Sequence, residues 1–254
     1  MTCDSSQLLK GYAYIMETFG STRAPKTDVK VRDVIDCGKC NSEFCDYSLY
    51  NHQLEVINAL EQGKNVILTA ATGSGKTEAW FLYAIRQIAK DRGFKVLAVY
   101  PTKALASDQA YRLYNYMECL GFDVHKVNSI YYGSLVRYDG DTSRNNDVKK
   151  SLATANIVLT NPQMLFSKLT SFGNPNLVVL DELDFYDSGK ATVLIEVLRS
   201  HFKSQFVVMS GTISNPQDFP KDFVFISGPS NRPEHRIYIV IGEEDKLRGV
   251  YNKH

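Results

Sequence analysis

The chain has 254 residues, of which 44% are hydrophobic and 22% are charged, and its formal net charge is +1. This composition is typical of a globular protein with one large or two small domains. A charge so close to zero excludes a global basic field for nucleic acid, so any such binding must use a local surface. No apolar run is long enough to span a bilayer, and the N-terminus lacks a signal-peptide core. We therefore expect no membrane partner and a cytoplasmic protein, or a nuclear one in a eukaryote.

The first 46 residues are expected to form an accessory segment, because so short a unit rarely holds a core alone. Apolar residues between positions 8 and 19 recur at helical spacing and predict an amphipathic helix. Alternation over residues 29–35 favours a strand that leads into a cluster of cysteines.

The chain has five cysteines, and Cys37, Cys40 and Cys45 lie close together in the sequence. An odd count without a secretory signal argues against a disulfide framework. The C-x2-C-x4-C spacing offers three thiolates, whereas tetrahedral zinc takes four ligands, so Cys3, His52 or a missing partner would have to supply the fourth. Reduced free thiols are the alternative interpretation, since no second C-x2-C is present.

From Leu49 onward, helical patterns alternate with short apolar runs. The expected helices cover residues 53–62, 78–90, 104–120, 164–169 and 191–201. The expected strands cover residues 66–69, 95–100, 126–131, 157–159, 177–180, 206–209 and 224–226, and a polar loop is expected at 133–146. This alternation predicts an α/β fold with a doubly wound, mostly parallel sheet. Ligands of such sheets bind beyond the carboxyl ends of the strands.

The stretch 66–77 reads V-I-L-T-A-A-T-G-S-G-K-T, an apolar run followed by a glycine-bearing loop and a helix-forming segment. A phosphate-binding loop requires this context, because loop N–H groups and the helix N-terminus attract an anion. Lys76 would reach the β- and γ-phosphates, and the Thr77 hydroxyl would bind Mg²⁺. Ala70 stands where the pattern usually has its first glycine, and its small side chain still permits the turn. The alternative is a Gly-Ser turn before an amphipathic helix.

A second acidic motif follows the apolar run 177–180, where Asp181 and Glu182 stand side by side. Asp181 would hold Mg²⁺, and Glu182 would orient and deprotonate the attacking water. A solvated acidic turn is the alternative, which the phosphate loop on another strand disfavours.

In their order along the chain, these motifs resemble the first RecA-like lobe of superfamily 2 DExD/H-box helicases. The matching stretches are 50–53, 71–77, 101–109, 160–165, 181–184 and 210–212. Within the superfamily, stretches 138–142, 160–165 and 210–216 look most like MrfA-type DNA repair helicases. Those proteins have His where Asp184 stands and Ala where Gly211 stands.

The resemblance implies a RecA-like P-loop lobe that uses ATP and Mg²⁺. Gln53 would read the adenine edge, and the alternative is that it caps or solvates the start of its helix. The phosphates would lie against Ala71, Thr72, Gly73, Ser74, Gly75, Lys76 and Thr77. Ser210 and Thr212 would couple hydrolysis to movement, with an ordinary strand-end turn as the alternative.

The resemblance also implies a nucleic-acid partner, DNA more than RNA. Pro101, Thr102 and Lys103, together with Thr160 and Asn161, would meet its backbone. Hydroxyls, an amide side chain and N–H groups at helix N-termini can bind phosphates without reading bases. Prolines at these positions can also simply start helices.

We expect a lobe at residues 47–227 and a tail at 228–254 that leads toward a second RecA-like lobe. That second lobe would carry the arginine finger, and no Q-x-x-G-R-x-G-R pattern occurs in this chain. The predicted function is therefore the ATP-binding motor lobe of a superfamily 2 DNA helicase or translocase, present as a fragment that hydrolyses ATP weakly. The alternatives are a catalytically silent nucleotide-binding scaffold, a motor subunit of a Cas3-like or restriction-type system, and an RNA helicase.

Overall fold

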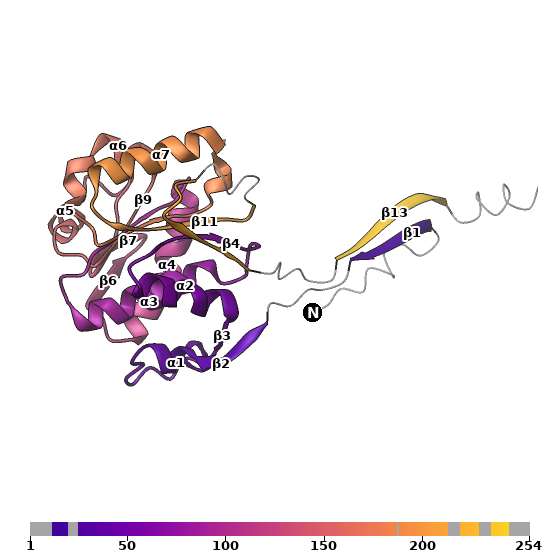
Figure 1. The fold of residues 1–254 in the computed structure, drawn as a ribbon, viewed down its shortest axis with the longest axis horizontal. Helices are drawn as coiled ribbons and strands as arrows, with labels where there is room; N and C mark the ends of the chain where they lie inside the picture. The colour runs from indigo at the N-terminus through magenta and orange to yellow at the C-terminus, as the bar shows by residue number, and fades with distance from the viewer. Residues whose placement is uncertain (1–11, 20–24, 187, 213–218, 229–234, 244–254) are drawn as a thin grey trace, which may run out of the picture. The chain divides into compact units, whose positions relative to one another are not determined.

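The computed structural model describes residues 12–19, 25–186, 188–212, 219–228 and 235–243 (Figure 1). The chain divides into two compact units, Ala24–Ser230 and a smaller unit built from both ends. In the smaller unit, β1 (Tyr12–Phe19) pairs antiparallel with β13 (His235–Glu243). The helix predicted for residues 8–19 is therefore wrong from Tyr12 onward, and residues 8–11 lie outside the described residues. Aromatic and β-branched residues such as Tyr14 and Ile15 suit a paired strand.

The larger unit is organised around a sheet of seven strands in the order β12-β4-β11-β10-β5-β9-β8. All of its neighbouring strands pair in parallel. In that order their bounds are Phe223–Ser227, Asn65–Thr69, Gln205–Ser210, Leu177–Leu180, Val96–Val99, Ile157–Thr160 and Leu135–Arg137. Continuous apolar runs form these strands because both faces of a parallel sheet are covered. The predicted doubly wound α/β fold is confirmed.

Six of the described helices of the larger unit pack around the sheet. They are α2 (Asn51–Glu61), α3 (Lys76–Lys90), α4 (Lys103–Cys119), α5 (Asn146–Leu152), α6 (Pro162–Ser167) and α7 (Ser188–His201). Short 3₁₀ turns follow at η2 (Leu169–Phe172) and η3 (Leu183–Phe185). Figure 1 shows α2, α3 and α4 on one side of the sheet and α6 and α7 on the other.

Alternate strand residues enter two separate cores, one on each face of the sheet. Val179 and Val207 pack in the core that contains Trp80 of α3. Val178 and Val208 pack in the core that contains Leu198 of α7. Helices therefore pack on both faces of the sheet, and this packing fixes the positions of the carboxyl ends of the strands.

The segment before the first helix of the sheet folds as a small layer of its own. Strand β2 (Lys26–Lys30) pairs antiparallel with β3 (Ser48–Tyr50), and between them lie α1 (Val31–Val34) and the 3₁₀ turn η1 (Glu43–Asp46). The strand predicted over residues 29–35 is thus wrong after Lys30. Alternation over so few residues did not separate a strand from a helical turn capped by the Asp33 carboxylate, which accepts from the Lys30 N–H at 2.7 Å.

A hairpin replaces the single strand predicted at 126–131. Strands β6 (Val124–Val127) and β7 (Ile130–Gly133) pair antiparallel outside the main sheet. Asn128 has φ of 55°, a left-handed conformation that asparagine tolerates in a tight turn. The loop predicted at 133–146 also contains the edge strand β8, and α5 was not predicted.

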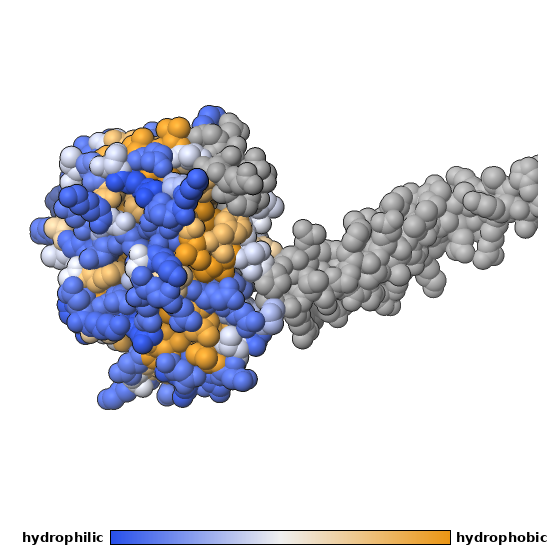
Figure 2. Space-filling view, in the orientation of Figure 1, coloured by the Kyte–Doolittle hydropathy of each residue, from blue (hydrophilic) through white to orange (hydrophobic). Residues whose placement is uncertain are grey.

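The face shown in Figure 2 is mostly hydrophilic, with apolar patches between the hydrophilic side chains. Exposed large hydrophobic residues include Phe166, Phe185 and Val193. None of the helices in the described ranges is long and apolar enough to cross a membrane.

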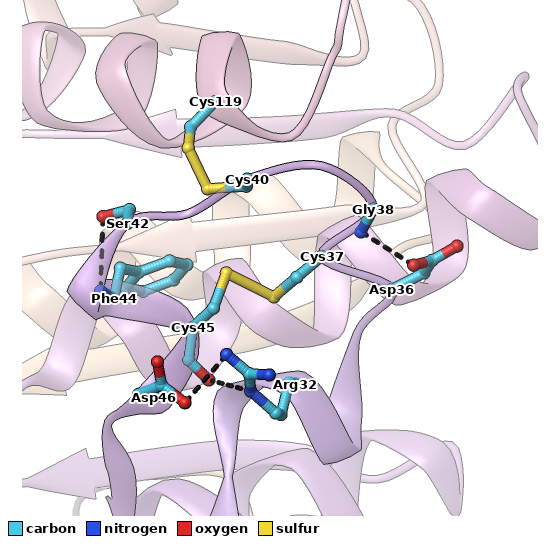
Figure 3. Close-up of a disulfide and its surroundings, with 10 residues drawn as sticks. All are labelled: Arg32, Asp36, Cys37, Gly38, Cys40, Ser42, Phe44, Cys45, Asp46 and Cys119. Atoms are coloured by element: carbon cyan, nitrogen blue, oxygen red, sulfur yellow. Dashed lines mark hydrogen bonds and ion pairs between the residues drawn. A yellow bond between two sulfur atoms is a disulfide. The ribbon is translucent and has the colours of Figure 1, made fainter.

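The cysteines pair differently from the sequence-based expectation (Figure 3). Disulfides join Cys37 to Cys45 and Cys40 to Cys119, so the prediction that no disulfide framework exists is wrong. Within the described residues, no three His, Cys, Asp or Glu side chains are arranged as a metal site. Cys3 lies outside the described residues. Pairing of Cys40 with a residue 79 positions away cannot be read from local spacing.

Candidate nucleotide and nucleic-acid site

The candidate site lies where five neighbouring parallel strands end, and backbone hydrogen bonds join these ends directly. The Ala70 N–H donates to the carbonyl of Ser210 at 3.2 Å, and the Asp181 N–H donates to the carbonyl of Val99 at 3.0 Å. Since β4, β11, β10, β5 and β9 are consecutive in the sheet, the motifs that follow these five strands lie at the same edge.

The loop after β4 wraps back on itself and begins α3. Gly73 and Gly75 have φ of 78° and 81°, values that favour glycine, and Gly75 is the N-cap of the helix. Lys76 is 6% exposed, and its ammonium donates to the carbonyl of Ala70 at 2.9 Å. Ala70 thus contributes its backbone carbonyl to the loop. Its small side chain is compatible with this buried position.

Two residues of α2 hold this loop. Gln53 donates from Nε2 to the carbonyl of Gly75 at 2.8 Å and accepts the Tyr50 N–H at Oε1, 2.9 Å away. His52 donates from Nε2 to the carbonyl of Ser74 at 3.0 Å. Burial lowers the pKa of His52, which keeps the ring neutral. Gln53 therefore both caps its helix and contacts the loop.

The carboxylates after β10 face the loop. A carboxylate oxygen of Glu182 lies 3.8 Å from the Lys76 ammonium. Glu182 has φ of 50°, uncommon for a residue other than glycine, and its N–H donates to Asp181 Oδ1 at 2.8 Å. This backbone turn directs the two adjacent carboxylates to one region. The side chain of Asp184 lies outside the described residues.

Tyr100 is fully buried and lies close enough to these carboxylates to interact with their charges. Burial, followed by the charges of Asp181 and Glu182, raises the pKa of Tyr100 well above its usual value. Its hydroxyl has no hydrogen-bond partner among the described residues. The group is thus a neutral, unsatisfied dipole next to two carboxylates, which no sequence motif indicated.

A cavity of about 390 Å³ opens at this edge. It is lined by Gln53, Lys76, Thr77, Asp181 and Glu182, as well as by loop residues Thr72, Gly73 and Gly75. The hydroxyl of Thr77 and the carboxylate of Asp181 are hard oxygen donors, the type that Mg²⁺ prefers. The residues present therefore fit a magnesium-bound triphosphate.

The sequence did not single out several residues of the cavity wall. Glu78 forms an ion pair with Arg112 and accepts the Tyr116 hydroxyl at 3.2 Å. Phe44 and Tyr47 line the same cavity. The i, i+4 spacing of Arg112 and Tyr116 could have indicated that both side chains lie on one face of α4.

Ser210 and Thr212 bond to each other at the end of β11. The Ser210 hydroxyl donates to the Thr212 carbonyl at 2.6 Å and accepts the Thr212 N–H at 3.2 Å. Residues 213–216 of the same motif lie outside the described residues. This closed turn stands beside the phosphate loop through the Ala70–Ser210 backbone bond.

The residues predicted to meet nucleic acid begin two helices at the same edge. Thr102, which follows Pro101, caps α4 by accepting the Leu105 N–H at 3.2 Å, and Lys103 pairs with Asp141 at 2.7 Å. Asn161 caps α6 by accepting the Met164 N–H at 2.9 Å. Thr160 is buried and donates to the Tyr138 carbonyl at 2.8 Å. The described contacts of these side chains are therefore within the protein. The N-termini of α4 and α6 lie at the carboxyl edge of the sheet.

Comparison with known proteins gives the same picture as the geometry. Residues 50–219 match the family described as DEAD/DEAH box helicase. The chain is 31% identical over 187 residues to Uncharacterized ATP-dependent helicase YprA of Bacillus subtilis, a match that covers 67% of this chain and 24% of that protein. It is 31% identical over 204 residues to ATP-dependent helicase HRQ1 of Saccharomyces cerevisiae, covering 71% and 18%.

A solved structure of DUF1998 helicase MrfA bound to DNA and AMPPNP superposes with a TM-score of 0.70 at 26% identity, covering 92% of this chain and 35% of that one. The chain thus spans about a quarter or less of the curated relatives named above. The family match covers more than half of the chain and includes every motif at the sheet edge. The chain belongs to the DEAD/DEAH box helicase family.

Proposed function

We propose that this chain is the ATP-binding motor lobe of a superfamily 2 DNA helicase or translocase. The observation that carries the proposal is the convergence of Lys76 with Glu182 and Asp181 from two separate strand ends at one cavity. A structural turn needs neither a buried lysine in a glycine loop nor a carboxylate pair facing it. Together these groups match what phosphoryl transfer requires.

Each group has a distinct role in this proposal. Lys76 and the N–H groups of residues 71–77 bind the β- and γ-phosphates. Thr77 and Asp181 hold Mg²⁺, which neutralises charge on the phosphates when bound. Glu182 orients the attacking water and accepts its proton. Ser210 and Thr212, at the end of the strand between β4 and β10, couple this chemistry to movement.

Gln53 would recognise adenine by adjusting bonds that it already makes. Its amide joins the start of α2 to the phosphate loop through Gly75. Binding of an adenine edge to this amide would therefore alter the hydrogen bond between Gln53 and the loop. This arrangement supports ATP as the preferred nucleotide.

DNA would bind at the helix starts of α4 and α6. Because the side chains of Thr102 and Asn161 cap these helices, phosphates would meet the remaining backbone N–H groups of the first turns, and Lys103 once it leaves Asp141. The MrfA structure contains both DNA and AMPPNP, which supports DNA as the partner. A second RecA-like lobe would supply the arginine finger, and such a motor would work in the cytoplasm or nucleus, where ATP and DNA are present.

Nucleotide binding by this chain tests the proposal. We expect a fluorescent ATP analogue to bind in the presence of Mg²⁺ and to be displaced by unlabelled ATP. Lys76→Ala should weaken binding strongly, whereas Lys90→Ala, at the exposed far end of the same helix, should leave it unchanged. Equal binding by both variants would contradict the assignment of the site.

Turnover tests the motor function in the complete gene product. We expect ATP hydrolysis that rises when single-stranded or duplex DNA is added, and rises less with RNA. Intact Mg-ATP binding with no turnover under any of these conditions would instead support a nucleotide-binding scaffold.

A further inference from the structure

Four of the five cysteines lie together, although one of them comes from a distant part of the chain. Cys37 and Cys45 have Cα atoms 6.3 Å apart, and those of Cys40 and Cys119 are 5.1 Å apart. The Cys40 N–H donates to the carbonyl of Cys37 at 2.9 Å, so a single turn connects the two pairs. Figure 3 shows both pairs at this turn, with Cys119 reaching in from α4.

We propose that in the reduced protein these four cysteines bind one zinc ion, with Cys119 as the fourth ligand. Tetrahedral zinc favours four thiolates, and C-x2-C in a tight turn is typical of structural sites. Cys45 is fully buried and Cys40 is 7% exposed, so the site is closed to solvent on one side. His52, an alternative fourth ligand, is instead engaged with Ser74.

In the structure the same four sulfur atoms are paired as two disulfides, and in this oxidised state they do not form a metal site. Two equivalents of a dithiol reductant transfer four electrons and four protons, and thereby convert both disulfides into four thiols. Zinc then binds the thiolates and releases their protons. Protein thiols are mostly kept reduced where ATP-dependent motors work, which favours the metal-bound state there.

The zinc site would hold one wall of the nucleotide cavity. Phe44, which precedes Cys45, stacks on Tyr116 with ring centroids 4.1 Å apart. Phe44 and Tyr47 both line the cavity with Gln53 and Lys76. Loss of the metal would therefore loosen this wall and weaken nucleotide binding. This last consequence rests on the proposed function, whereas metal binding itself does not.

Metal analysis of the chain purified under reducing conditions tests the proposal. We expect one zinc per chain by elemental analysis and native mass spectrometry. Replacing zinc with Co²⁺ should give the visible absorption of a tetrahedral cobalt thiolate centre. A chain without zinc, lighter by the hydrogens lost in two disulfides and yielding the Cys37–Cys45 and Cys40–Cys119 linked peptides, would overturn the proposal.

Single variants test the fourth ligand. Cys119→Ser should lose most of the zinc, Cys119→His should retain it because imidazole also binds zinc, and Cys3→Ser should keep a full equivalent. A full equivalent of zinc in Cys119→Ser would overturn the assignment of Cys119. Should Cys119→Ser fail to fold, the cobalt spectrum of the unmodified chain still decides, because three thiolates and four thiolates differ in their charge-transfer intensity.

Nucleotide affinity is measured separately. Removal of zinc with a chelator should weaken binding of the fluorescent ATP analogue several-fold, and added zinc should restore it. Unchanged affinity in the metal-free chain would contradict the link to the cavity wall. Failure of any nucleotide to bind, with zinc present, would count against the proposed function and leave the metal site standing.

Discussion

The ammonium of Lys76 lies 3.8 Å from a carboxylate oxygen of Glu182, although the two residues follow strands that are separated in the sheet by β11. Lys76 also donates to the carbonyl of Ala70. The lysine thus contacts a carbonyl of its own loop and a carboxylate that follows β10. A triphosphate would replace these partners with charged oxygens, which form stronger hydrogen bonds with an ammonium.

Lys76→Ala removes this charge from the phosphate loop. A hydrogen bond to a charged group is worth about 1.5–3 kcal/mol, so we expect ATP affinity to fall by roughly tenfold to a hundredfold. Titration calorimetry with Mg-ATP measures the change, and circular dichroism checks that the fold is retained. An affinity within twofold of the original would show that the phosphates bind elsewhere.

Glu182→Gln separates binding from hydrolysis. The amide keeps the size of the side chain but cannot accept a proton, and general-base catalysis typically contributes about 10²–10⁴-fold to the rate. We expect DNA-stimulated ATP turnover by the complete gene product to fall by that factor while nucleotide affinity is retained. Turnover at the original rate would exclude Glu182 as the base.

Gly75→Ala tests the contact between the phosphate loop and α2. An alanine Cβ at Gly75 would lie 2.3 Å from Gln53 Nε2, so Gln53 must move. Gly121 is a matched control, because it has φ of 78° but open space around its Cβ position. Both variants should lose about 1 kcal/mol of folding stability from the left-handed backbone. Only Gly75→Ala should also weaken ATP binding; equal binding losses would disprove the role of the Gln53 contact.

Tyr100→Phe tests the buried hydroxyl near the two carboxylates. Since that hydroxyl has no partner among the described residues, its removal should leave the free energy of unfolding unchanged or raise it by about 1 kcal/mol. The pKa of Tyr100 is higher in the folded chain than in the unfolded chain. The folded state is therefore not penalised by this group below about pH 10, and it loses stability as the pH rises above that value.

Chemical denaturation at several pH values measures this effect. The unmodified chain should lose stability above about pH 10, and Tyr100→Phe should lose less of it over the same range. Identical pH profiles would show that the hydroxyl is solvated in solution. A large loss of stability at neutral pH would show that it has a partner.

The sequence predicted the centre of the lobe well, and the physical reason is burial. Strands β5, β9 and β10 are covered on both faces, so they appear as short apolar runs that no surface pattern obscures. The phosphate loop was recognisable because Gly73 and Gly75 occupy conformations that few other residues adopt. At such positions the local backbone conformation favours glycine regardless of distant contacts.

Errors occurred where distant partners decide the structure. Residues 12–19 form a strand because β13 pairs with them from the other end of the chain, which helical periodicity cannot indicate. Cys119 meets Cys40 only once α4 packs beside the N-terminal segment. The cavity wall made by Phe44 and Tyr47 depends on the same packing. Sequence spacing reports neighbours along the chain, and these contacts are between segments.

The ion pair with Asp141 occupies the ammonium of Lys103, which lies at the proposed DNA-binding edge. Their side chains are 2.7 Å apart and exposed. The hydrogen bond to Asp141 raises the pKa of Lys103, and the same bond lowers the pKa of Asp141, so both stay charged and paired. Bound phosphate must therefore compete with Asp141 for this lysine.

Asp141→Asn should free Lys103 and tighten DNA binding, whereas Lys103→Ala should weaken it. Because each phosphate contact releases counterions, Lys103→Ala should reduce the slope of log K against log salt by about one unit. Fluorescence anisotropy with labelled DNA at several salt concentrations measures both effects. Lys90→Ala, away from this edge, is the charge-matched control. Equal slopes for the two lysine variants would show that Lys103 does not meet the DNA backbone.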